Sequence, residues 1–314
     1  MMILDRLFKR KIIICVHGLS NKPPEKLLRK WWKQSIMEGF ETTGVKKRSF
    51  NCIMVYWADL LHDAPQDTSV TDEKSDRFLK KPYRKGDTSK YRDFSPSVLK
   101  QKLLQMLERK LDKAFFDENS IINYDRISDL VVKNLYKDLD FYYNRDCPVV
   151  KYRGLNAMRE IRGRLASVLR KHRHKKILLI AHSMGTIISH DVLTRTAPDI
   201  TLHTLITIGS PLGLPLVIKK ICRERGQDFW KDHIVPAPEN ITSRWLNFSD
   251  LSDRVAINYN LADDFKKNSR GIGPADSIVY NNYEIGGKRD AHNAYGYCRA
   301  PEVAQAIHDF IGSK

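Results

Sequence analysis

Ser183 stands between two segments whose residue patterns change abruptly. Before it, residues 176–181 form a short apolar run of strand character, and a helical pattern begins directly after it. A sharp strand-to-helix turn strains the backbone of such a serine and holds its hydroxyl clear of the sheet edge. Ala181 and Gly185 are small enough to leave that turn unobstructed. The pattern indicates a nucleophilic serine, although ordinary strand–helix turns share it, so the assignment depends on further residues.

Two other segments read as buried strands that end in a turn. The first, residues 11–18, ends in His17-Gly18, and the second, residues 202–209, is followed by Ser-Pro-Leu. In these turns and in its Ala-His-Ser-Met-Gly motif, the sequence resembles the α/β-hydrolase superfamily, and within it the lipase- and esterase-like serine hydrolases. The resemblance covers residues 11–57 and 151–300. Alanine replaces the first glycine of the usual Gly-x-Ser-x-Gly motif.

The resemblance implies a Ser-His-Asp triad in which the acid and the base follow the serine along the chain. His292 lies in a loop after the last predicted strand and is the predicted general base. His308 lies inside a helical pattern and is predicted to be a surface or packing residue. Asp250 and Asp253 both follow a predicted strand. Asp253 is the predicted acid because its Asp-Arg-Val sequence is similar to the Asp-Pro-Val turn of the superfamily, but arginine replaces proline, so Asp250 remains an alternative.

The resemblance also assigns the oxyanion hole to the backbone N–H groups of Leu19 and Met184. One such donor, aimed at the charge that develops on a carbonyl oxygen, contributes about 10²–10³ in rate. The predicted function is hydrolysis of a carboxylic ester, of a small molecule or a lipid, through an acyl-enzyme and with no cofactor. Two alternatives stay open. One is acyl transfer or peptide hydrolysis on the same triad, and the other is a catalytically silent scaffold that binds an anionic partner.

These residues can meet only if the elements that carry them alternate along the chain. Strand patterns occur at residues 11–18, 51–57, 177–181, 202–209, 244–248 and 277–285. Helical patterns occur at residues 25–40, 155–171, 186–196 and 301–311. The alternation predicts an α/β fold, with a mostly parallel, twisted sheet flanked by helices in a single domain over residues 1–314. Together with the resemblance, it predicts the α/β-hydrolase fold.

The alternation lapses in residues 58–150, a highly charged stretch that we call the cap region. A helix is predicted there over residues 98–111. One face of this helix is an apolar stripe made by Leu99, Leu103, Leu107 and Leu111. We predict a mainly helical insertion that covers the active site, with the stripe packed on its own domain and contact with a membrane as the alternative. A second, shorter cap element is predicted over residues 214–240.

The chain is strongly basic. Its net charge is +17, from 54 Lys and Arg against 37 Asp and Glu. Such a field attracts anionic surfaces, so peripheral contact with an anionic membrane surface is one expectation. The densest cluster, residues 170–176, lies where a helix ends, and its charge complements the helix dipole. Nothing resembles a nucleic-acid-binding motif, so nucleic acid is not an expected partner.

The N-terminal residues and the cysteines bear on location and metal binding. Residues 1–10 lack a continuous apolar stretch and a cleavage site, and no run of about 18 apolar residues occurs, so a cytoplasmic protein is predicted. The cysteines are odd in number and scattered: Cys15, Cys52, Cys147, Cys222 and Cys298. We expect them to be reduced, small apolar residues. His172 and His174 have no partner at ligand spacing, so no metal site is predicted.

Overall fold

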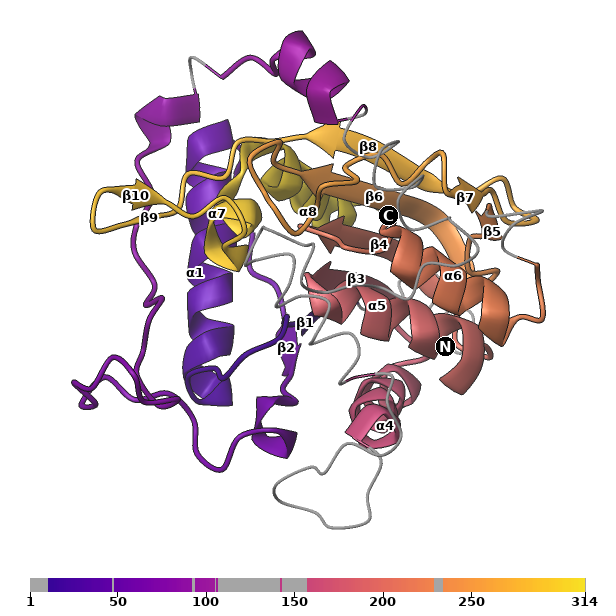
Figure 1. The fold of residues 1–314 in the computed structure, drawn as a ribbon, viewed down its shortest axis with the longest axis horizontal. Coiled ribbons are helices and arrows are strands. Elements are labelled where there is room, and N and C mark those ends of the chain that lie inside the picture. Colours follow the sequence, from indigo (N-terminus) through magenta and orange to yellow (C-terminus); the bar gives the residue numbers. More distant parts are fainter. Residues whose placement is uncertain are drawn as a thin grey trace, which may run out of the picture.

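A parallel sheet forms the centre of the molecule. The computed structural model describes residues 11–46, 48–91, 94–104, 106, 142, 157–228 and 234–313. The six-stranded sheet has the order β2-β1-β3-β4-β6-β8, and every neighbouring pair is parallel (Figure 1). Its strands are β1 (Lys11–Val16), β2 (Cys52–Val55), β3 (Lys176–His182), β4 (Leu202–Ile208), β6 (Ile241–Ser249) and β8 (Pro274–Ile278). The predicted α/β class with a parallel sheet is confirmed.

Helices cover both faces of the sheet (Figure 1). One face carries α1 (Glu25–Thr43), α7 (Ala294–Arg299) and α8 (Pro301–Gly312), and the other carries α4 (Ala157–Lys171), α5 (Met184–Asp191) and α6 (Pro215–Glu224). Successive strand residues point to opposite faces. On β3, Leu178 and Ile180 belong to the core under α1, whereas Ile177 and Leu179 belong to the core under α4. Burial on both faces explains why β1 and β3 are continuous apolar runs.

The order of the strands reverses between β1 and β3. From β1 the chain passes through α1 to β2 on one side, while β3 pairs with the other side of β1 and borders β4. In open parallel sheets, ligands bind in the crevice outside the carboxyl ends of the strands at such a reversal. Here the crevice lies between Val16, which ends β1, and His182, which ends β3. The residues after these two ends are those singled out by the sequence.

The predicted strand over residues 277–285 is wrong. β8 ends at Ile278, and the chain then leaves the sheet. Asn281 lies at the break, where its backbone N–H donates to Oδ2 of Asp250 at 2.7 Å and its side-chain amide donates to two backbone carbonyls at 2.9 and 2.8 Å. These bonds replace the ladder bonds that a continued strand would need. The remainder forms a separate two-stranded hairpin of β9 (Glu284–Ile285) and β10 (Lys288–Arg289).

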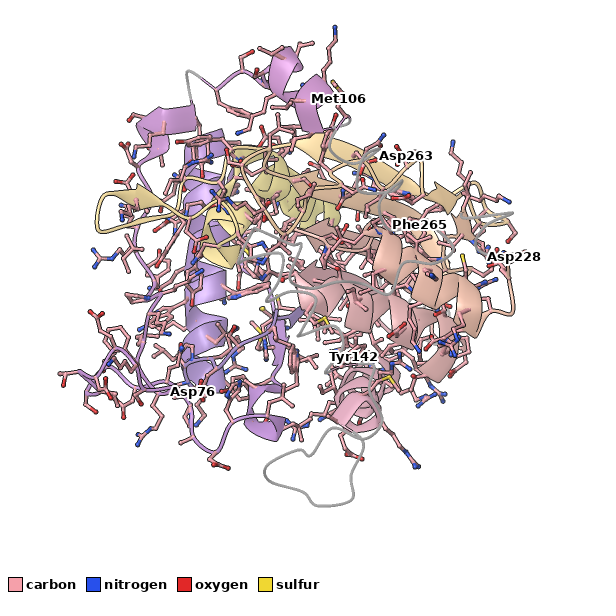
Figure 2. The ribbon with its side chains drawn as sticks, in the orientation of Figure 1. Asp76, Met106, Tyr142, Asp228, Asp263 and Phe265 are labelled. Carbon is pink, nitrogen blue, oxygen red and sulfur yellow. The ribbon has the colours of Figure 1, made fainter. Side chains whose placement is uncertain are left out.

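Part of the cap region is described, and that part is less regular than predicted. Residues 58–91 contain two short 3₁₀ turns, η1 (Ala58–Leu60) and η2 (Thr88–Tyr91). The predicted helix 98–111 is present at residues 98–104 and 106, and its last five positions lie outside the described residues. In the apolar stripe, Leu99 is 79% exposed and Leu103 is 56% exposed, and the neighbouring Met106, labelled in Figure 2, is 55% exposed. The expected packing of this stripe on its own domain is therefore wrong for the described residues.

The second predicted cap element, residues 214–240, contains α6 and β5 (Val235–Pro236). Three apolar side chains of α6, Val217, Ile218 and Ile221, are buried in the core under α4 and α5. This element is therefore part of a helical layer, and β5 pairs with β7 (Phe265–Lys266) at its edge. Among the described residues, no helix has the length and apolar character needed to cross a membrane.

Candidate active site

Ser183 occupies a strained turn between β3 and α5. Its backbone has φ 55° and ψ −129°, a conformation that costs a side-chain-bearing residue free energy and persists only where its surroundings impose it. Two glycines allow the close packing there. A Cβ on Gly185 would lie 2.7 Å from the carbonyl oxygen of Val16, and a Cβ on Gly18 would lie 2.7 Å from Cβ of Ser183. The turn is therefore pressed against the end of β1.

His292 links Ser183 to a carboxylate. Its Nε2 lies 2.9 Å from Oγ of Ser183, and its Nδ1 lies 2.8 Å from Oδ2 of Asp253. A carboxylate only accepts, so Nδ1 carries the proton of that bond and Nε2 is left to accept from the serine hydroxyl. The structure thus brings together all three side chains that the sequence named. Of the two candidate acids, Asp253 is the one that contacts the histidine.

Asp253 is held by more than His292. Its side chain is fully buried, Oδ1 accepts the backbone N–H of Val255 at 2.8 Å, and Oδ2 also accepts the hydroxyl of Tyr297 at 2.8 Å. A buried carboxylate needs such donors because no water solvates it. Asp250 has a different task, since it accepts from Arg289 at 2.6 Å and from the backbone of the loop after β8. It fixes that loop and makes no contact with His292.

His182, which precedes the serine, was not singled out by the sequence. Its Nε2 lies 2.7 Å from the carbonyl oxygen of His292, so it carries a proton and donates it there. Burial, followed by the nearby His292, holds the pKa of His182 well below its ordinary value. This neutral ring fixes the backbone of the loop that carries His292. The role of Tyr297 was not singled out by the sequence either. Its position five residues after His292 was the available signal, because a buried tyrosine hydroxyl needs a hydrogen-bond partner.

His17 stabilises the end of β1. The backbone N–H of Trp57 donates to its Nε2 at 3.0 Å, the indole N–H of Trp57 donates to its carbonyl at 3.1 Å, and the two rings are stacked at 4.6 Å. Burial lowers the pKa of His17 to about 3, so the ring is neutral. These contacts fix the chain just before Gly18 and Leu19. The role of His17 is to shape the turn, and it makes no hydrogen bond to Ser183 within the described residues.

The residues of the two predicted oxyanion donors line the same cavity as the serine. Met184 is the first residue of α5, so its backbone N–H has no acceptor inside the helix. Leu19 follows the turn at Gly18, and both residues line a cavity of about 400 Å³ beside Ser183. The positive end of the α5 dipole points to the same place. The arrangement suits an oxygen that becomes negative next to the serine.

The cavity has walls of two kinds. Its apolar part includes Leu28 and Trp32 of α1, one helical turn apart, and Tyr295 of α7. Its charged part consists of lysines 22, 80 and 81, which were not singled out by the sequence apart from the basic composition of residues 80–90. None of the described residues that line it is Asp or Glu. His182, Ser183 and His292 also line the cavity.

Metal binding and similarity to known proteins add no further assignment. Among the described residues, no group of three or more His, Cys, Asp or Glu side chains is placed to hold a metal ion. No protein-family model and no curated protein sequence matches the chain. The functional argument therefore depends on the geometry around Ser183.

Proposed function

We propose that the chain is a serine hydrolase of the α/β-hydrolase type that cleaves a carboxylic ester. One observation carries the proposal: the hydrogen-bonded chain from Asp253 through His292 to Ser183, which ends at a strained turn beside a cavity. A serine hydroxyl is a weak nucleophile until a base removes its proton, and that base works best when a carboxylate fixes its tautomer. The contacts at 2.8 and 2.9 Å supply both requirements.

The reaction follows from these contacts. His292 Nε2 takes the hydroxyl proton while Oγ of Ser183 attacks the ester carbonyl carbon, and the carbonyl oxygen becomes an oxyanion next to the N–H groups of Leu19 and Met184. His292 then gives its proton to the leaving alkoxide, which departs as the alcohol. Water, deprotonated by His292, attacks the acyl-enzyme and releases the acid, and Ser183 regains its proton. Asp253 stabilises the imidazolium at each step.

A serine-directed phosphonate tests the proposal. Intact-mass measurement after treatment with a fluorophosphonate should show one stoichiometric adduct on the native protein and none on Ser183→Ala, since only an activated hydroxyl displaces fluoride readily. Ser210→Ala is the matched control because Ser210 also follows a strand of the sheet, yet its Oγ bonds to Thr186 at 2.9 Å. This control should be labelled like the native protein.

Two results would contradict the proposal. One is labelling of Ser183→Ala at the native level, which would place the reactive group elsewhere. The other is absence of any adduct on the native protein, with and without detergent, together with no turnover of esters of short or long chain. That second result would favour the catalytically silent scaffold.

A further inference from the structure

The charged wall of the cavity is fixed in position. Lys22 Nζ donates to the carbonyl oxygens of Leu19 and Ser20, the latter at 3.0 Å, so its ammonium group lies beside the predicted oxyanion hole. Lys81 Nζ lies 2.5 Å from Oδ2 of Asp290, whose Oδ1 accepts the backbone N–H of His292 at 3.2 Å. Positive charge is thus held next to Leu19 and next to the loop that carries His292.

The segment that carries Lys80 and Lys81 is anchored by buried contacts. The hydroxyl of Tyr283 donates to the carbonyl of Pro82 at 2.7 Å. The guanidinium of Arg299, which is 1% exposed, donates to the carbonyl of Arg84 at 2.6 Å. Because neighbouring residues are held this firmly, the two lysines stay at the cavity.

The balance of charge at the cavity is one-sided. Three ammonium groups line it, and none of the described lining residues is acidic. Asp290, which does not line the cavity, is engaged by Lys81 and is 21% exposed at its side chain. Lys80 makes no ion pair with any of the residues that the structure describes. A neutral ester would bring no negative charge to these lysines, whereas an anion would be attracted to them.

Apolar side chains form another part of the cavity wall. Leu28, Trp32 and Tyr295 belong to that part. Apolar surface of this kind binds hydrocarbon rather than charge. The two walls together fit an ester that has an apolar part and an anionic part.

We propose that the substrate is an amphiphilic ester that carries a phosphate or carboxylate group, which Lys22, Lys80 and Lys81 bind while its apolar part lies against Leu28 and Trp32. This inference rests on the proposed function, because it concerns the same cavity and the same serine. The anion either belongs to the acyl part or to the alcohol part of the ester. Both cases use the same recognition, a negative charge among three ammonium groups.

Two matched substrate pairs test the inference. The first pair, para-nitrophenyl hexanoate and the mono-para-nitrophenyl ester of adipic acid, differs by a carboxylate at the far end of the acyl chain. The second pair, a monoacylglycerol and the acylglycerol phosphate with the same acyl chain, differs by a phosphate on the alcohol. We expect kcat/KM to be about tenfold or more higher for the anionic member of at least one pair, and the pair that shows it identifies the charged part. The preference should weaken with added salt.

Removal of lysine charges at the cavity is the second test of this inference. The double variant Lys80→Gln, Lys81→Gln should lower the ratio of kcat/KM for the anionic over the neutral ester several-fold, because two of three ammonium groups are lost. The matched control is Lys74→Gln, Lys85→Gln, which removes the same charge from exposed residues of the same segment that do not line the cavity. The control should keep the ratio of the native protein.

The outcomes separate the two proposals. If both members of each pair are cleaved equally well, or the neutral one better, the inference on substrate charge is overturned while the hydrolase remains. Equal ratios in the cavity variant and its control would also overturn it. If no ester is cleaved and the phosphonate gives no adduct, the hydrolase itself fails and the inference fails with it.

Discussion

Three histidines line the cavity beside Ser183, and their partners give them different tasks. His17 and His182 are buried, and burial lowers the pKa of both, so they are neutral rings that fix backbone. His292 lies at the cavity and is the one whose Nε2 contacts the serine. The proposed base is therefore distinct from the two buried histidines that fix backbone, and each role can be tested by itself.

Tyr297→Phe tests the support of the triad acid. The hydroxyl of Tyr297 donates to Asp253 and accepts the backbone N–H of Asp250 at 2.9 Å. Its loss removes one donor from a buried carboxylate, and a hydrogen bond to a charged group contributes about 1.5–3 kcal/mol. We expect kcat for an ester to fall about tenfold or more with little change in KM.

Tyr283→Phe is the control for that variant. Its hydroxyl is also bonded, to the carbonyl of Pro82, but it does not contact the triad acid. We expect a lower free energy of unfolding and a native kcat for a neutral ester, because Lys80 and Lys81, whose segment this bond anchors, are inferred to bind only the anionic part of a substrate. If both variants lower kcat equally, the effect of Tyr297 is general destabilisation and no specific support of Asp253.

The buried ring of His190 predicts a pH dependence of stability. Burial, followed by the charges of Arg225, Arg195 and Arg162, lowers its pKa to about 3 from an ordinary value of 6.5. Between these pH values the unfolded chain binds a proton that the folded chain does not, so stability falls as the pH falls. The loss for one such histidine is about 2 kcal/mol between pH 7 and pH 5.

The contribution of His190 can be measured by urea unfolding at pH 7 and pH 5. The native protein is compared with His190→Leu at both pH values. The difference in free energy of unfolding between the two pH values should be smaller in the variant by about 2 kcal/mol. An unchanged difference would mean that His190 is protonated in the folded state. His17 and His182 are present in both proteins, so their contribution cancels.

At the residue scale, the sequence predicted the groups that react better than the groups that support them. Ser183, His292 and Asp253 could be named because their types and their order in the chain fit one chemistry. His182 and Tyr297 act through hydrogen bonds to residues 110 and 44 positions away, and no local pattern carries that information. Their roles could therefore be recognised only from the three-dimensional structure.

The strand-to-helix turn works as a unit with the end of β1. Gly185 approaches the carbonyl oxygens of Val16 and His17 so closely that a Cβ would lie 2.7 and 2.9 Å from them. Backbone atoms of a buried strand cannot move aside as a flexible side chain can. The turn, the strand end and the loop after it therefore keep one geometry relative to each other.

Gly185→Ala tests this coupling. Forcing a methyl group into that space should lower the free energy of unfolding by about 1–3 kcal/mol and reduce kcat, because the end of β1 must shift. Gly163→Ala is the matched control: it lies in α4, and nothing lies within 4 Å of a Cβ built there. The control should raise stability by about 0.5–1 kcal/mol, and kcat should stay native. If Gly185→Ala changes neither the free energy of unfolding nor kcat, the end of β1 can shift to accept the methyl group, and the proposed coupling is wrong.

At the scale of elements, prediction succeeded where packing and local pattern agree. The strand patterns at residues 11–18 and 202–209 correspond to β1 and β4 because both are buried on two faces. The pattern at residues 277–285 failed because Asn281 uses its hydrogen bonds for the loop that carries His292. The hydrogen bonds of Asn281 to residues distant in the chain therefore ended the strand that the apolar pattern had predicted.

At the scale of the molecule, the cap region is joined to the body by buried charged groups. Tyr142, labelled in Figure 2, donates to Asp191 at 3.0 Å and accepts from Arg162 at 2.9 Å. On the other side, Arg299 contacts Glu38 of α1 at 3.2 Å and the segment at Arg84. The sequence marked residues 58–150 as different but gave no sign of these anchors, because they pair residues that lie far apart in the chain.

Arg299→Met tests the second anchor. It leaves the carboxylate of Glu38 without its buried cation, and breaking a buried ion pair costs about 3–5 kcal/mol. Thermal or urea unfolding should show a loss of this size. Arg170→Met is the control, because its ion pair with Asp199 at 3.4 Å is exposed and should contribute less than about 1 kcal/mol. Equal losses would mean that the Arg299 pair is as weak as a surface pair.

The separation of the triad along the chain has a consequence for protein synthesis. Ser183 and His292 are 109 positions apart. Since ribosomes add about 5–20 residues per second, the serine is made roughly 5 to 20 s before the histidine that would activate it. During that interval the nascent chain holds Ser183 without its proposed base, so we expect the serine to become reactive only after translation has passed His292.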